Sequence, residues 1–115
     1  MASYSGNAIT TAELKTVLTS LKNQREAISN EYNNNIRRVL DSSSSCFSVA
    51  GLDYNTIIDT FDDTFSTMDK NFENLIYVLE NNIIKNYTEL VAAIRQMFGK
   101  SFADKLTNLL GINSK

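Results

Sequence analysis

The acidic residues between positions 59 and 69 come closer to a catalytic cluster than any other group in this sequence. They are Asp59, Asp62, Asp63 and Asp69. Acid–base or nucleophilic catalysis needs convergent groups, and here neither a histidine nor a glycine-rich phosphate loop accompanies the carboxylates. Carboxylates are favoured in the first turns of a helix because the helix dipole is positive there, which explains these acids better. We therefore expect no catalytic residue and no enzymatic activity.

Cys46 is the single cysteine, and the sequence contains no histidine. One cysteine cannot form a disulfide within the chain, although an intermolecular disulfide stays open. Without histidine there is no Cys–His nucleophile pair, no zinc ligand set of the common kinds, and no Glu-x-x-His pair for a di-metal helical bundle. We expect no metal site and no cofactor.

The composition is that of one folded domain covering residues 1–115. It is 43% hydrophobic and 21% charged, which is too apolar for a disordered tail. No apolar run reaches the roughly 18 residues that a membrane-spanning helix needs, and residues 1–7 lack the features of a cleavable signal peptide. The net charge of −2 with scattered basic residues argues against a nucleic-acid partner.

The first helix is predicted over residues 11–40. Thr10 and Glu13 have the spacing of a capping box at its start. Apolar residues then follow in three- and four-residue steps, at Leu14, Leu18, Leu21, Ile28, Tyr32, Ile36 and Val39. The serines of residues 42–45 compete for backbone hydrogen bonds and Gly51 adds backbone freedom, so a turn is predicted over residues 41–52.

A second, longer helix is predicted over residues 53–98, with Asp53 as its N-cap. Its apolar residues run from Tyr54 to Met97 in the same steps, for about six heptads. Gly99 is a natural residue to end it, and Ser101 with Asp104 resembles a capping box for a short helix over residues 101–110. The predicted fold is all-α: an antiparallel hairpin of two unequal helices with a short third helix.

The excess length of the second helix predicts a partner interface. A helix over residues 53–98 is roughly 65 Å long, against about 45 Å for the first. The overhanging apolar face comprises Leu75, Leu79, Ile83, Tyr87, Leu90, Ile94 and Met97. Three coverings stay open: the third helix folding back, a second copy of the chain, or a different helical protein. Two hairpins together can close a four-helix bundle, so we expect at least a dimer. A monomeric three-helix domain is the alternative.

This layout resembles the WXG-type, ESAT-like hairpin proteins of type VII secretion. Residues 9–14 resemble the common opening of that family, and Val49-Ala50-Gly51 stands where W-x-G ends the first helix. Val49 takes the place of the tryptophan, and the aromatic Tyr54 follows Gly51 by three residues. The resemblance covers residues 8–95 and implies an export substrate or an adaptor that accompanies an exported toxin.

The resemblance also implies an export signal, which is an aromatic and an acidic residue four positions apart on the second helix. Phe65 and Asp69 have this spacing. Residues at i and i+4 share a helix face, so a secretion ATPase is expected to receive the ring and to pair the charge. The protein is then cytoplasmic before export and secreted without a cleaved signal peptide. In the simpler interpretation Phe65 belongs to the helix seam and Asp69 is surface charge.

Two other functional classes use the same pattern. A membrane-active hairpin is conceivable because residues 75–98 are rich in apolar side chains, although Lys85, Glu89 and Arg95 keep that stretch amphipathic. A cytosolic chaperone, an immunity protein or a phage coiled-coil protein would bind its partner by the same helix packing. The sequence favours a non-enzymatic helical interaction protein and leaves these classes open.

Overall fold

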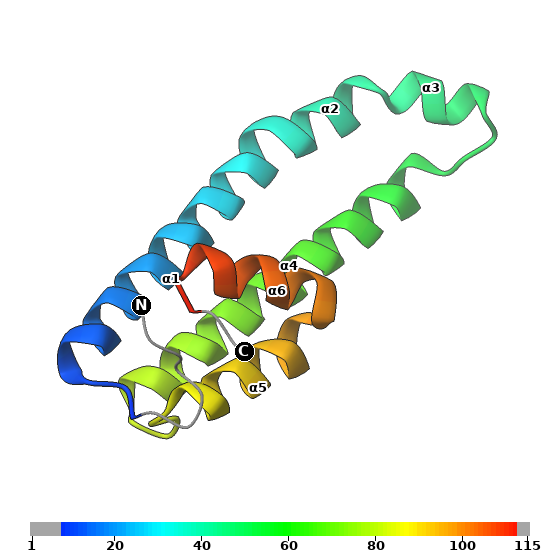
Figure 1. Cartoon of the computed structure of the whole chain (residues 1–115). Coiled ribbons are helices and arrows are strands. Elements are labelled where there is room, and N and C mark those ends of the chain that lie inside the picture. The colour runs from blue at the N-terminus through cyan, green and yellow to red at the C-terminus, as the bar shows by residue number, and fades with distance from the viewer. Residues whose placement is uncertain (1–7, 113–115) are drawn as a thin grey trace. The chain divides into compact units, whose positions relative to one another are not determined.

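The computed structural model describes residues 8–112, which form a predominantly α-helical fold (Figure 1). The elements are α1 (Thr11–Glu31), the π-helical segment η1 (Tyr32–Ile36), α2 (Arg37–Ser42), α3 (Ser44–Val49), α4 (Tyr54–Glu80), α5 (Tyr87–Phe98) and α6 (Lys100–Leu109). The chain divides into two compact units. We call described residues 8–23 and 71–112 the core unit, and residues 24–70 the hairpin unit.

The start of α1 is fixed by the predicted capping box. The Thr10 N–H donates to Glu13 Oε1 at 3.0 Å, and the Glu13 N–H donates to Thr10 Oγ1 at 3.2 Å. The hydrogen bond from the Thr10 backbone lowers the pKa of the Glu13 carboxyl. Just before the helix, the Ile9 N–H donates to the Lys85 carbonyl at 2.9 Å, which ties the segment that precedes α1 to the loop before α5.

The π-helical segment η1 changes which residues of the first helix face α4. Ile36 and Val39 were expected in the seam, and this prediction is wrong, because their side chains are 39% and 63% exposed. Leu40 is buried instead, and Arg37 bonds Asp62 of α4. A π-helical turn holds one more residue than an α-helical turn, so every later position is shifted by one.

The predicted turn over residues 41–52 is shorter in the structure. The first helical run continues to Ser42, whose hydroxyl donates back to the Arg38 carbonyl at 2.7 Å. Ser43 interrupts the helix with φ −98° and ψ 7°, and α3 follows. The serines were expected to favour an irregular loop, but a helix also satisfies a serine hydroxyl through the preceding carbonyl. The true reversal comes after α3, where Gly51 has φ 78°.

The prediction of one helix over residues 53–98 is wrong. Asp53 caps its start as expected, accepting from the Asn55 N–H at 3.2 Å, but α4 ends at Glu80. Asn82 adopts φ 54°, a left-handed conformation that asparagine tolerates better than most residues. Asn86 then caps α5 by accepting from the Glu89 N–H at 2.9 Å.

The C-terminal helix begins one residue earlier than predicted, at Lys100. Gly99 ends α5 with φ 80°, as expected, and its N–H donates to the Arg95 carbonyl at 3.0 Å. The predicted capping box of Ser101 and Asp104 is wrong, because Gly99 is the N-cap of α6 and no side chain caps that end. The Asp104 carboxylate lies 3.8 Å from the Arg95 guanidinium instead.

The core unit holds most of the apolar burial. Within it α5 and α6 pack beside the first turns of α1 and the last turns of α4 (Figure 1). Phe72 of α4 lies 4.9 Å from Phe98 of α5 and 6.4 Å from Phe102 of α6, between ring centroids. Fourteen of the seventeen buried apolar residues among those described belong to this unit, so it provides most of the hydrophobic stabilisation.

Candidate interaction site in the helical hairpin

The hairpin unit consists of two antiparallel arms joined through α3. The first arm comprises residues 24–42 and the second arm residues 54–70 of α4. Arg25 Nε donates to Asp69 Oδ1 at 2.8 Å and Arg25 Nη2 donates to Asp69 Oδ2 at 3.0 Å, a bidentate pair. The hydrogen bond from Arg25 lowers the pKa of the Asp69 carboxyl, although partial burial opposes this. This pair closes the end of the hairpin farthest from its turn.

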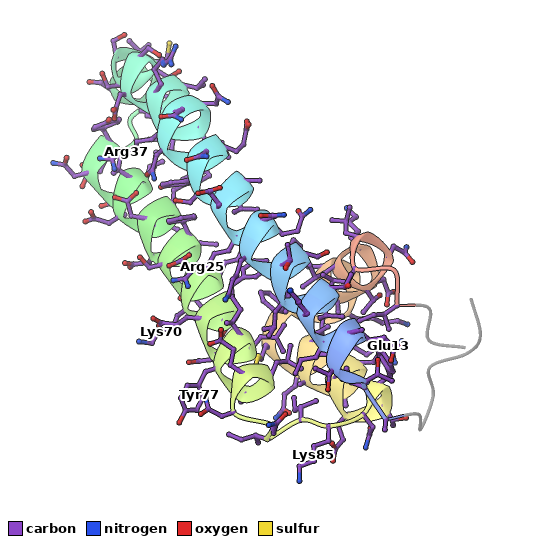
Figure 2. The ribbon with its side chains drawn as sticks, turned by 90° about the vertical axis from the view of Figure 1, so that its left-hand side faces the viewer. Glu13, Arg25, Arg37, Lys70, Tyr77 and Lys85 are labelled. Carbon is purple, nitrogen blue, oxygen red and sulfur yellow. The ribbon has the colours of Figure 1, made fainter. Side chains whose placement is uncertain are left out.

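A second polar cluster lies nearer the turn and centres on Asp62. The Tyr32 hydroxyl donates to Asp62 Oδ1 at 2.5 Å, and Arg37 Nη1 donates to Asp62 Oδ2 at 3.1 Å. Arg37 Nε also lies 3.4 Å from Asp41 Oδ1. Burial, and then the hydrogen bond to Asp62, raises the pKa of Tyr32 to about 12. Figure 2 shows Arg25 and Arg37 between the two arms.

Aromatic rings pack between the two polar clusters and also beside the turn. Phe65 stacks on Tyr32 with ring centroids 4.6 Å apart and planes 5° from parallel. Phe47 of α3 lies 6.1 Å from Tyr54, whose hydroxyl donates to Asp41. That hydrogen bond raises the pKa of Tyr54. The two arms are therefore joined by ion pairs, hydrogen bonds and ring stacking more than by aliphatic packing.

The two residues of the predicted export signal both face the first arm. Phe65 lies on the Tyr32 ring and Asp69 binds the Arg25 guanidinium. The arrangement of a ring and a carboxylate on one face of α4 is present, as the i and i+4 spacing predicts. Both groups make their contacts within the hairpin.

Large apolar side chains are exposed in the hairpin unit. Only Tyr32, Leu40 and Ile58 are buried there. Five large apolar residues are exposed, at Ile36 (39%), Val39 (63%), Val49 (89%), Leu52 (52%) and Phe61 (43%). The turn motif Val49-Ala50-Gly51 is exposed throughout.

The predicted partner interface beyond Leu75 is mostly buried, unlike the exposed apolar side chains of the hairpin unit. Five of its seven residues are buried in the core unit by the chain's own helices, at Leu75, Leu79, Tyr87, Leu90 and Ile94. Met97 is half-buried and Ile83 is 58% exposed. The sequence left open that the third helix folds back over this surface, and in the structure α6 lies against α5. Among the described residues, most exposed large apolar side chains lie instead in residues 36–61.

The remaining chemistry of the described residues is sparse. They contain no group of three or more histidine, cysteine, aspartate or glutamate side chains that could hold a metal ion. Cys46 is exposed. A cavity of about 350 Å³ in the core unit is lined by Ala12, Glu13, Thr16, Val17, Tyr87, Leu110, Gly111 and Ile112. Its carboxylate, Glu13, is held ionised by the capping hydrogen bonds, which makes it a poor general acid.

Comparison with protein-family models, curated proteins and solved structures finds no match for this chain. Across residues 8–112, no helix is long and apolar enough to cross a membrane. The hairpin unit, with its polar seam and exposed apolar side chains, is the feature from which a function can be argued.

Proposed function

We propose that this protein is a non-enzymatic helix-pairing protein whose hairpin unit binds another helical protein. One observation carries the proposal: the hairpin unit buries three apolar residues and exposes five large ones. Covering such side chains is favourable at roughly 25 cal/mol per Å² of apolar surface, and grouped exposed apolar residues mark interaction sites.

The polar seam is consistent with a hairpin that gains stability from a partner. Arg25 and Asp69 are each about one-third exposed, at 33% and 34% of their side-chain surface. Ion pairs of that exposure contribute about 0–1 kcal/mol each, well below the contribution of a buried aliphatic layer. The arms therefore hold their register while five large apolar side chains stay exposed, and these are left for a second protein.

Hydrogen exchange tests this function. Because the hairpin has few buried apolar contacts, we expect amides of residues 24–70 to exchange faster than those of the core unit when the protein is dilute. Adding the helical partner, or raising the concentration of the protein itself, should slow exchange in residues 24–70 selectively. Equal protection of both units under every condition, with no bound protein, would contradict the proposal.

A narrower form of the proposal is that the protein is a type VII secretion substrate or export adaptor, pairing with itself or with an exported toxin. Its support is the hairpin layout and the Phe65 and Asp69 pair on one face of α4. Because both side chains contact the first arm, a secretion ATPase can receive them only where the arms separate. The competing interpretation is that the pair serves the hairpin alone.

Export assays with three variants separate these interpretations. Phe65→Ala and Asp69→Ala remove the motif, whereas Arg25→Ala breaks the same ion pair and leaves the motif intact. If the motif is a signal, the first two variants should be retained in the cell and Arg25→Ala should be exported normally. If Asp69→Ala and Arg25→Ala lower secreted protein equally, the pair acts only through the fold.

A further inference from the structure

The seam residues of the second arm divide α4 into two flanks. Ile58 is buried, and Asp62, Phe65 and Asp69 contact the first arm. Each residue turns a helix by 100°, so positions just before and just after a seam residue lie on opposite flanks. The preceding positions are Ile57, Phe61, Thr64 and Met68, and the following positions are Asp59, Asp63, Ser66 and Lys70. One flank is apolar and the other is charged.

The first arm has the same division once its π-helical segment is taken into account. Its seam residues are Arg25, Tyr32, Arg37 and Leu40. The positions before them are Gln24, Glu31, Ile36 and Val39, and the positions after them are Glu26, Asn33, Arg38 and Asp41. Ile36 and Val39 reach this flank only because η1 shifts the register by one residue.

The two apolar rows lie on the same flank of the hairpin. In an antiparallel pair of right-handed helices, the position before a seam residue turns to the same side on both helices. We call this side the apolar flank; it comprises Ile36, Val39, Ile57, Phe61 and Met68, with Gln24, Glu31 and Thr64. The opposite side, the charged flank, holds Glu26, Arg38, Asp41, Asp59, Asp63 and Lys70. The charged flank thus has six charged residues and the apolar flank one.

We propose that the apolar flank is the docking surface and that its occupant is the same flank of a second copy of this chain. The inference rests on the proposed helix-pairing function and names its surface and partner. Two hairpins joined in this way form a four-helix bundle, with the apolar rows inside and the charged flanks in water.

Charge favours a second copy as the occupant. The hairpin unit carries four basic residues, Arg25, Arg37, Arg38 and Lys70, against eight acidic ones, so two copies joined through their charged flanks would repel each other. The apolar flank has Glu31 as its one charged position, near the middle of the first arm. Two copies can therefore meet there with little like-charge repulsion.

The available area is sufficient for a modest dimer. The second arm is about 25 Å long, and two helices side by side are about 20 Å wide. Such a face presents on the order of 500 Å² per copy in projection, and two copies reach the roughly 1,000 Å² expected of a specific interface. That is the lower end of the range, so the dimer should be reversible and depend on concentration.

The η1 segment builds this surface. In an uninterrupted α-helix, Ile36 would take the seam position of Arg37, and Val39 that of Leu40. The apolar flank would then lose both apolar residues that the first arm contributes to it. π-helical turns are uncommon and are often found at functional sites. The η1 segment thus moves two apolar residues from the seam to the exposed flank. A protein that acts alone does not need an apolar flank.

Sedimentation equilibrium tests the proposal with matched variants. The parent should be a reversible dimer, and Val39→Ser with Phe61→Ser should weaken dimerisation at least about tenfold while helicity is retained. Arg38→Ser with Asp63→Ser on the charged flank is the control and should leave the dimer unchanged. Deletion of Asn34 should restore an uninterrupted helix, withdraw Ile36 and Val39 into the seam and weaken the dimer.

The outcomes separate this inference from the function on which it rests. A monomeric parent, or a dimer that the apolar-flank variants leave intact, overturns docking of a second copy. A monomer whose apolar flank is needed to bind a different helical protein overturns the choice of occupant and leaves the helix-pairing function standing. A monomer that binds no helical protein overturns both. Loss of helicity in the deletion variant leaves the decision with the serine variants, whose positions are exposed.

Discussion

The core unit and the hairpin unit use the same two helices in different ways. In the core unit, α1 and α4 contribute Leu21, Phe72, Leu75 and Leu79 to a closed apolar layer with α5 and α6. In the hairpin unit, the same helices meet through Arg25–Asp69 and Tyr32–Asp62–Arg37. Apolar packing tolerates small changes in register, whereas bidentate ion pairs and hydrogen bonds to charged groups fix it. The first unit supplies stability, and the second supplies a defined surface.

Phe72→Ala should have the largest effect, because it removes a side chain that is 1% exposed and contacts rings of α5 and α6. Truncating a buried phenylalanine costs about 3–5 kcal/mol, so the free energy of unfolding in urea should fall by that amount. Phe61→Ala is the matched control on the same helix, and at 43% exposed it should lose less than about 1 kcal/mol. Equal losses would remove the contrast between the units.

Asp62→Asn tests the polar seam at its most connected residue. The change weakens the acceptor that both Tyr32 and Arg37 use, and hydrogen bonds to a charged group contribute about 1.5–3 kcal/mol. We expect the free energy of unfolding to fall by about 1–2 kcal/mol, since Arg37 is partly exposed. The adjacent Asp63→Asn lies on the charged flank and should change it by less than about 0.5 kcal/mol. A similar effect at both positions would show that the seam contacts contribute little.

Tyr32 gives the hairpin unit a sensitivity to alkaline pH. Its folded pKa is about 12 against an ordinary value near 10. A group whose folded pKa is raised stabilises the fold fully below the unfolded pKa, and this contribution is lost as pH rises through the folded pKa. Between pH 10 and 12 the parent should lose stability more steeply than Tyr32→Phe, which should itself lose about 1 kcal/mol at neutral pH. The free energies of unfolding are measured in urea at each pH. If they fall in parallel for the two proteins between pH 10 and 12, this prediction is wrong.

The sequence predicted several of the helix ends because their signals are local. The capping box of Thr10 and Glu13, the cap at Asp53 and the glycine at residue 99 each act within one turn of the chain, and each is confirmed. The break between α4 and α5 also has a local signal, in Asn82 and in the Asn86–Glu89 cap. The three- and four-residue spacing of apolar residues continues through that break, so it predicts one continuous helix in spite of the asparagines.

The polar seam depends on contacts that no local pattern in the sequence predicts. Three- and four-residue spacing predicted Ile36 and Val39 in the seam, because periodicity assumes an uninterrupted α-helix and η1 violates that assumption. The contacts of Asp62 with Tyr32 and of Asp69 with Arg25 join residues 30 and 44 positions apart, so no local pattern reveals them. The spacing of Phe65 and Asp69 predicts that they share a face of α4, and in the structure each side chain contacts the first arm.

Arg25 and Asp69 provide the smallest and most specific test of the polar seam. The pKa of Asp69 is lowered in the folded protein, so the pair stabilises the fold above the unfolded pKa near 3.8, and the contribution is lost as pH falls through the folded pKa. Arg25→Met keeps the aliphatic stem and removes the charge. We expect it to cost about 0.5–1 kcal/mol at neutral pH and nothing in strong acid. Lys22→Met in the core unit breaks the more exposed pair with Glu80, at 56% and 45% exposed, and should cost less. Urea unfolding at two pH values decides this, and an equal, pH-independent loss in both variants would mean that neither pair fixes the register of the helices.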